Sequence, residues 1–266
     1  MNSYRIDLKY VGADFHGWQS QPSGRGVQDH LEKALKTILR HDVRVTAASR
    51  TDTGVHAEHQ VATFKTAEPF DEKRWLKSLH GLLPESVGVT AVKPVAAEFH
   101  PIYSGKGKAY RYRLWLGAER NPMVAPFVWQ LYYECNVDKI QGEAKTIIGR
   151  HDFTAFCAAD SSAKTKVRTV HQVEVHANGP LVDIWIIGDG FLKQMVRILV
   201  GTLVEVGTGK AQPGAILRAV ASGKRDDAGK TAPAQGLSLV EIFYDAMPTI
   251  AALRQRLSGE YTLKIS

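Results

Sequence analysis

Several features of secreted, membrane and disulfide-rich proteins are missing from this sequence of 266 residues. It has only two cysteines, Cys135 and Cys157, whose spacing suits neither a disulfide framework nor a metal site. No apolar run is long enough to span a bilayer, and the first residues carry charges at Arg5, Asp7 and Lys9 where a signal peptide would be apolar. Low-complexity segments are absent as well. We therefore expect a globular, cytoplasmic protein with no membrane contact.

Common catalytic motifs are missing or incomplete. The sequence "GTGK" is similar to the end of a phosphate-binding loop, but Val204 and Ala211 stand where that loop needs glycine and Ser or Thr, so no nucleotide cofactor is expected. Aspartic proteases need two Asp-Thr-Gly triplets, or a symmetric dimer, and here the triplet occurs once, at 52–54. His56 and His59 lack the spacing of a zinc protease and an obvious third ligand. These absences argue against an aspartic protease, a zinc protease and a protein that binds nucleoside triphosphates.

Positive charge is in excess. Lys and Arg number 34 against 27 Asp and Glu, which gives a net charge of +7 with neutral histidines and a sequence pI of about 9.3. Such an excess favours polyanionic partners, with nucleic acid ahead of an anionic membrane surface. Hydrophobic residues make up 44% of the chain, which is ample for a buried core.

The first hundred residues predict a strand, a helix, two strands, a helix and a strand. Apolar residues alternate with charged ones from Tyr4 to Tyr10, as in a strand with one buried face. In residues 27–39 the apolar residues recur at helical spacing. The remaining segments are strands near 43–47, 60–65 and 87–95 and a second helix around 75–79.

The same order recurs in the second half of the chain. The predicted strands are 108–116, 166–176, 181–187 and 237–244, and the predicted helices are 140–148, 191–206 and 215–221. Two β-α-β-β-α-β units in tandem indicate an α+β protein of two ferredoxin-like halves, each with an antiparallel sheet and helices on one face. We place the halves at residues 1–103 and 104–266.

The segment "ASRTDTGVHAEHQ", residues 48–60, places one carboxylate, Asp52, in a polar loop between two predicted strands. The local sequence is typical of a turn, in which an Asp side chain caps backbone N–H groups and Gly54 adopts a positive φ. A loop carried by a rigid sheet is also a common place for a reactive carboxylate. Arg50 lies on the same side as Asp52 if the backbone stays extended. Local sequence leaves both interpretations open.

Cations and aromatic residues occur together in the second half. In "KAYRYRLWL", Lys108, Tyr110 and Tyr112 share one face, and Arg111 and Arg113 share the other. This pattern suits stacking on bases and pairing with phosphates, and it equally suits a half-buried strand.

Two more basic features follow. The loop "SSAKTKVRTV" carries Lys164, Lys166 and Arg168, which either bind phosphates or are simply solvated. The apolar helix predicted at 191–206 has one narrow polar stripe. Its members, spaced four residues apart, are Lys193, Arg197, Gly201 and Glu205. An arginine on such a helix lies at its rim or pairs with a carboxylate.

Six segments in order resemble the tRNA pseudouridine synthase A (TruA) family, and the resemblance covers nearly the whole chain. They are "YVGADFHGWQSQ" followed by "VQDHLEKAL", then "RTDTGVHA", "KAYRYRL", "HDFTAF", "FLKQMVRILVGTLVEVG" and "APAQGLSL". The resemblance implies an isomerase that converts uridine to pseudouridine at positions 38, 39 and 40 of the tRNA anticodon stem-loop, with no cofactor or metal. It also implies a homodimer holding one tRNA.

The resemblance further implies roles for individual residues. Asp52 corresponds to the catalytic aspartate, Tyr110 to a tyrosine beside the target base, Arg197 to the arginine that pairs with the aspartate, and Arg50 to an arginine linked to base flipping. Because Asp52 and Arg197 belong to different halves, we expect the site in a cleft between them. Lys164, Lys166 and Arg168 are expected to contact the RNA.

The sequence departs from the family pattern at Thr53, where alanine is usual, at His59, near a usual glycine, at Gly26, where threonine is common, and at Ile102, where arginine is frequent. None of these changes removes an expected catalytic residue. Two alternatives to the implied function stay open, a pseudouridine synthase with another RNA target and a non-catalytic RNA-binding protein on the same fold.

Overall fold

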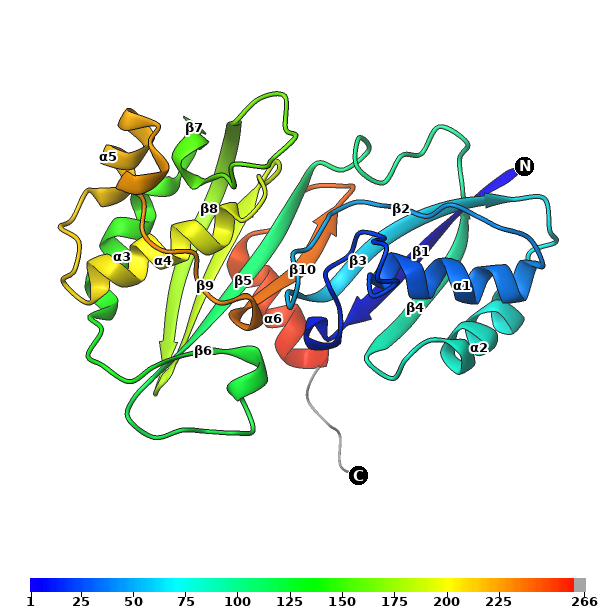
Figure 1. Cartoon of the computed structure of the whole chain (residues 1–266), viewed down its shortest axis with the longest axis horizontal. Helices are drawn as coiled ribbons and strands as arrows, with labels where there is room; N and C mark the ends of the chain where they lie inside the picture. Colours follow the sequence, from blue (N-terminus) through cyan, green and yellow to red (C-terminus); the bar gives the residue numbers. More distant parts are fainter. Residues whose placement is uncertain (261–266) are drawn as a thin grey trace.

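One ten-stranded sheet runs through the whole molecule (Figure 1). The computed structural model describes residues 1–260. The strands lie in the order β4-β1-β3-β10-β5-β9-β8-β7, while β2 pairs with β3 and β6 pairs with β5. None of the helices described in this range is long and apolar enough to cross a membrane.

The first half has the predicted β-α-β-β-α-β order. Its elements are β1 (Asn2–Tyr10), α1 (Val27–Leu39), β2 (Thr46–Ala47), β3 (His56–Thr66), α2 (Glu72–Leu82) and β4 (Val87–Val95). β1 is antiparallel to both β3 and β4, and β2 is antiparallel to β3. At the start of α1 the Asp29 carboxylate accepts the Gly26 N–H, and at the start of α2 the Asp71 carboxylate accepts the Arg74 N–H. The spatial order β4-β1-β3-β2 is that of a ferredoxin-like unit.

The second half repeats this order with additions. Its core elements are β5 (Gly107–Leu116), α3 (Val137–Ala144), β8 (Val167–Asn178), β9 (Leu181–Gly188), α4 (Met195–Gly207) and β10 (Leu237–Phe243). The added elements are β6 (Trp129–Leu131), β7 (Gly149–Asp152), α5 (Ala215–Ser222) and α6 (Ile250–Glu260). The antiparallel order β10-β5-β9-β8 matches that of the first half. The α+β prediction of tandem β-α-β-β-α-β units is therefore confirmed.

The two halves join through one short parallel pairing, between β3 and β10. In this pairing Ser238 lies beside His56 and Leu239 beside Ala57. The far end of the same β3 edge is occupied by β2, which pairs with Ala62 and Thr63. The edge of β3 is thus shared between a strand of each half, and the chain that leaves β2 must pass over the gap between them.

Helices cover both faces of the sheet, which differs from the predicted single covered face. The main core lies under α1 to α5 and includes the inward residues of every long strand. A smaller core on the other face packs α6, through Ile250 and Leu253, against Ala109, Trp185 and Val240 (Figure 1). The helix α6 was missing from the sequence prediction because its apolar residues are weakly segregated to one side.

Helix α4 begins later than the predicted residue 191. Its first residue is Met195, because Gln194 before it has a positive φ of 63°, a left-handed conformation that interrupts the helix. The polar stripe on this helix binds the segment at 229–232. Arg197 Nε donates to the Ala232 carbonyl at 2.8 Å, and the Glu205 carboxylate accepts the Lys230 N–H at 3.0 Å.

Gly201 lets that segment cross α4 closely. A Cβ at this position would lie 1.7 Å from the Lys230 carbonyl oxygen, so a side chain would force the two segments apart. The segment carries the carbonyl that orients Arg197. Gly201 therefore affects both stability and the position of that guanidinium.

We expect Gly201→Ala to lower the free energy of unfolding by roughly 2 kcal/mol or more, because overpacking outweighs the gain in helix propensity. The matched control is Gly81→Ala in α2, where a Cβ meets nothing within 4 Å. There the same change should stabilise the protein by up to about 1 kcal/mol. Urea unfolding of the two variants measures whether their free energies of unfolding change in opposite directions. Equal changes would contradict the close contact between Gly201 and the segment at 229–232.

Candidate active site

The Asp52 loop spans the gap between β2 and β10. Its last ladder bond runs from the Ala48 N–H to the Val61 carbonyl at 2.8 Å, and the chain rejoins the sheet at His56. Between these points the Val55 N–H donates to the Asp52 carbonyl at 3.1 Å, closing a β-turn with Gly54 at a φ of 80°. A positive φ at the third position of a turn favours glycine. The turn chemistry predicted for Gly54 is confirmed.

Buried hydrogen bonds fix the loop on the sheet. The Trp18 N–H donates to the Thr51 carbonyl at 3.1 Å, and the Tyr10 hydroxyl lies 2.7 Å from Thr51 Oγ1. Gln60 Nε2 donates to the Ser49 carbonyl at 2.7 Å. Thr51, Ser49 and Gln60 are all buried. Residues on either side of Asp52 are therefore held before any ligand binds.

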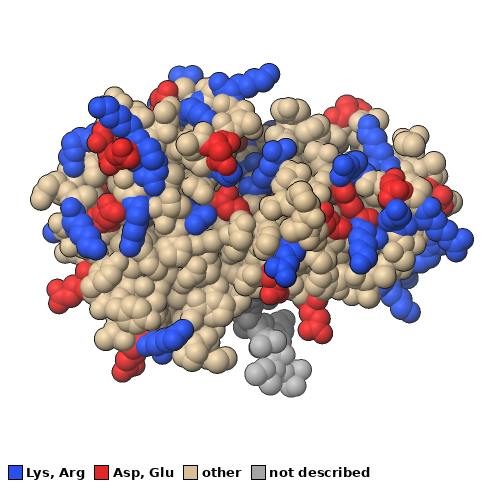
Figure 2. Space-filling model, in the orientation of Figure 1, with Lys and Arg blue, Asp and Glu red and all other residues tan. Residues whose placement is uncertain are grey.

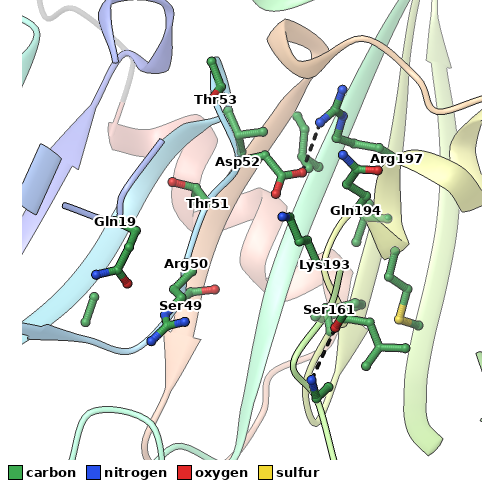
Figure 3. A pocket seen from close by; sticks show the side chains of 18 of the residues that line it. Gln19, Ser49, Arg50, Thr51, Asp52, Thr53, Ser161, Lys193, Gln194 and Arg197 are labelled. Carbon is green, nitrogen blue, oxygen red and sulfur yellow. Dashed lines mark hydrogen bonds and ion pairs between the residues drawn. The ribbon is translucent and has the colours of Figure 1, made fainter. Parts of the chain in front are cut away.

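Asp52 pairs with Arg197 across the two halves. Arg197 Nη1 lies 3.0 Å from Asp52 Oδ2, and the side chains are 15% and 20% exposed. Figure 3 shows the two side chains pointing toward each other, one from the loop and one from α4. The bond from Arg197 Nε to the Ala232 carbonyl orients the guanidinium. The carboxylate thus keeps one oxygen outside the ion pair.

Tyr110 lies on β5, with its hydroxyl 2.9 Å from the Ser49 Oγ of the Asp52 loop. The ring is 6% exposed and meets Phe191 edge to face, with centroids 5.0 Å apart. Burial raises the pKa of Tyr110, and the nearby carboxylate of Asp52 adds to the rise. The phenol is therefore protonated at neutral pH.

These residues line one cavity of about 850 Å³. Among its lining residues are Arg50, Asp52, Lys108, Tyr110, Lys193 and Arg197. Figure 2 shows a hollow at the upper centre of the molecule, with Lys and Arg side chains in and around it. The walls come from both halves, as the sequence led us to expect.

The expected RNA contacts divide into two groups. Arg50 lines the cavity but is exposed, and it extends away from the Asp52–Arg197 pair (Figure 3). Within residues 1–260 no hydrogen bond or ion pair involves its side chain. Lys164, Lys166 and Arg168 lie outside the lining, next to residues 160–163, which do line it. The structure thus brings four of the expected residues to the cavity and leaves three beside it.

Lys108 is a cavity residue that the sequence analysis did not select. Its ammonium donates to the Ala48 carbonyl at 2.8 Å. Burial, with a smaller contribution from the Arg168 charge, lowers the pKa of Lys108 to about 8. Among the described residues no carboxylate pairs with it. The signal in the sequence was the strand alternation, which placed Lys108 on the same face as Tyr110.

Lys193 and Gln194 form the far wall of the cavity. Lys193 Nζ donates to the Asp160 carboxylate at 2.6 Å, on the exposed side. Gln194 is one of two non-glycine residues with a positive φ among residues 1–260. Such backbone strain is found most often at functional sites.

His56 and His59 face different partners. The Nδ1 atom of His56 accepts the Gly12 N–H at 3.0 Å, while Nε2 of His59 lies 3.1 Å from the Asp7 carboxylate. Nε2 of His56 also lies 3.1 Å from the Gln235 carbonyl, so this ring forms hydrogen bonds with both halves of the protein.

Comparisons with known proteins agree with this geometry. A family model described as tRNA pseudouridine synthase matches residues 8–104 and 144–245. The chain is 40% identical over 243 residues to tRNA pseudouridine synthase A of Bacillus licheniformis, covering 91% of this chain and 98% of the relative. It is 41% identical over 242 residues to the protein of the same name from Aquifex aeolicus, covering 91% and 99%. The corresponding protein of Acetivibrio thermocellus is 39% identical over 244 residues, covering 92% and 100%.

The ammonium of Lys108, which is half-buried in the cavity wall, predicts a pH-dependent stability. Below pH 8 Lys108 is charged in both states, and the folded protein carries the full desolvation penalty. Between pH 8 and 10.5 the folded state loses the proton first, so the free energy of unfolding rises with pH by up to about 3 kcal/mol. We expect wild type to gain stability relative to Lys108→Met over this range.

Urea unfolding of both proteins at pH 7 and at pH 10 measures this gain. Lys106→Met is the matched control, because Lys106 is exposed two residues away. The difference in free energy of unfolding between Lys106→Met and wild type should be the same at both pH values. If the difference between Lys108→Met and wild type is also the same at both pH values, the lowered pKa of Lys108 is contradicted.

Proposed function

The chain belongs to the tRNA pseudouridine synthase family, and we propose that it isomerises uridine to pseudouridine at positions 38, 39 and 40 of the tRNA anticodon stem-loop. The observation that carries this proposal is the Asp52–Arg197 pair, 3.0 Å apart in a cavity built from both halves. The cavity volume of about 850 Å³ is ample for a nucleoside. The net charge of +7 favours a polyanionic substrate.

The reaction rearranges bonds within one nucleotide. The bond from C1′ of the ribose to N1 of uracil breaks, the base rotates, and a bond from C1′ to C5 forms. The C5 proton is lost and N1 ends protonated, so atoms and electrons balance without a cofactor. Asp52 supplies the carboxylate, either as a nucleophile toward the ring or C1′ or as a base that starts elimination from the sugar.

Arg197 and Tyr110 have different roles beside that carboxylate. Arg197 holds one oxygen of Asp52 and is itself held by the Ala232 carbonyl, which leaves the second carboxylate oxygen for the substrate. Tyr110 offers a ring beside the target base. Its raised pKa keeps the phenol protonated at neutral pH, which favours a contact or hydrogen-bond donor role over that of a resting base.

The target base must leave the RNA stack to reach Asp52, at a cost of a few kcal/mol. Arg50 is suited to assist, because it lies at the cavity and its guanidinium has no partner among residues 1–260. Lys164, Lys166 and Arg168 extend the basic surface beside the cavity, where they bind phosphates. Contacts of this kind make the affinity fall steeply with salt.

We also propose a domain division, a cellular compartment and an oligomeric state for the protein. The two matched segments, 8–104 and 144–245, support a division into halves at residues 1–103 and 104–266. The protein would act in the cytoplasm. As the resemblance implies, it would act as a homodimer that holds one tRNA.

Asp52→Asn should lower the rate of pseudouridine formation by at least about 10³-fold, because the amide has the same shape but no charge. Carbodiimide labelling and reverse transcription of unmodified tRNA map the product. Asp160→Asn is the matched control, since Asp160 also lines the cavity and pairs with a cation, Lys193. We expect less than about a tenfold change there.

The outcomes separate the alternatives. Full activity of Asp52→Asn would refute the catalytic assignment. No product anywhere in tRNA or other RNA with wild type would favour a binding protein, and product outside the anticodon arm would indicate another target.

Light scattering tests the oligomeric state. One chain has a mass of 29.3 kDa, so the homodimer has twice that mass. A mass of 29.3 kDa for the protein without tRNA, at working concentration, would contradict the dimer.

A further inference from the structure

The turn between β4 and β5 holds two large hydrophobic side chains in solvent at the edge of the cavity. Ile102 is 43% exposed and lines the cavity that contains Asp52. Tyr103, the next residue, is 84% exposed. Single exposed hydrophobic residues are ordinary, but two adjacent ones beside an active site indicate a contact surface.

Hydrogen bonds to His100 fix this turn. His100 Nδ1 accepts the backbone N–H groups of Ile102 and Tyr103, at 3.2 and 3.3 Å. The Ser104 N–H donates to the His100 carbonyl at 2.9 Å, and the Ser104 hydroxyl accepts the His100 N–H at 3.1 Å. The imidazole also lies against the Tyr103 ring, with centroids 4.4 Å apart and planes 33° from parallel.

The turn is also fastened to the sheet. The Tyr244 hydroxyl donates to the Pro101 carbonyl at 2.8 Å, and the Lys106 N–H donates to the Phe243 carbonyl at 2.7 Å. A backbone held in this way does not have to be ordered when the turn binds a partner, and the His100 imidazole already packs against the Tyr103 ring. The exposed Ile102 and Tyr103 side chains are therefore presented in advance of binding.

We infer that Ile102 and Tyr103 form an apolar wedge that stacks on the RNA bases next to the target uridine. This inference rests on the proposed function. A base that leaves the stack exposes its neighbours, and an apolar or aromatic side chain can cover the face it leaves. Ile102 lines the same cavity as Asp52, and Tyr103 follows it in the turn, so the pair lies where a base beside a flipped uridine would be exposed.

Charge around the wedge favours RNA over a protein partner. Arg50 is exposed and lines the cavity, and Lys106, which is also exposed, follows the turn in the sequence. An exposed aromatic residue in a region that also carries cations suits a base with its phosphates. Ile102 stands where the family resemblance leads to an expected arginine, so this chain offers an apolar contact at that point in place of an ionic one.

The test compares kcat/KM for unmodified tRNA among variants with wild-type circular dichroism. Tyr103→Ala should lower kcat/KM by about 10- to 100-fold, the usual effect of losing one stacked base. Tyr103→Phe, which keeps the ring, should stay near wild type. Tyr132→Ala is the matched control, because Tyr132 is also exposed but neither of its chain neighbours lines the cavity, and it should change little.

Two further readouts separate stacking from a general loss of binding. The ratio of kcat/KM between wild type and Tyr103→Ala should be the same at about 50 and about 200 mM salt. Loss of a phosphate contact would instead make binding less dependent on salt, so that this ratio would change. A 2-aminopurine next to the target uridine should fluoresce differently with wild type and with Tyr103→Ala, because stacking quenches it.

A Tyr103→Ala protein within twofold of wild type would overturn the inference while leaving the proposed function intact. So would a change from dimer to monomer in light scattering, since Tyr103 would then contact a second copy of the chain. A wild-type protein that makes no pseudouridine would overturn the proposed function and this inference with it.

Discussion

The ion pair between Asp52 and Arg197 is the contact on which the site depends. It joins the loop before β3 in the first half to α4 in the second. A pair of charges that are only 20% and 15% exposed is costly to leave unmatched, so each half needs the other. The short β3–β10 pairing brings the two halves together, and the ion pair links that assembly to the chemistry.

The path of the chain explains why the carboxylate lies where it does. The edge of β3 is occupied by β2 at one end and by β10 at the other. The Asp52 loop crosses the gap, held by Tyr10, Trp18 and Gln60. On the opposite side, the segment at 229–232 orients Arg197. Both partners of the ion pair are thus set before substrate arrives, which is how enzymes avoid reorganisation during reaction.

Much of this was visible in the sequence, because alternation and helical spacing are local. They predicted the core elements of both halves and the α+β class, but not the short strands β6 and β7. The β3–β10 pairing was not visible, since Leu239 and Ala57 are far apart in the chain and parallel pairs leave no turn between them. Helix α6 was also missed.

In the active site too, the features that depend on contacts between distant residues could not be predicted from local sequence. Asp52 stood out only when placed beside Tyr110 and Arg197, because its local sequence fits an ordinary turn. Lys108 was overlooked, as its bond to the Ala48 carbonyl joins residues 60 positions apart. The direction of Arg50 was not predictable from an assumed extended backbone, because the fold of the loop decides it.

The most direct test of the central claim is a crystal structure of Asp52→Asn with an unmodified anticodon stem-loop. The account predicts a uracil turned out of the stack into the cavity, with its ring beside Tyr110 and its C1′ and C6 facing residue 52. A stem-loop whose bases all remain stacked, or one bound away from the cavity between the halves, would contradict it.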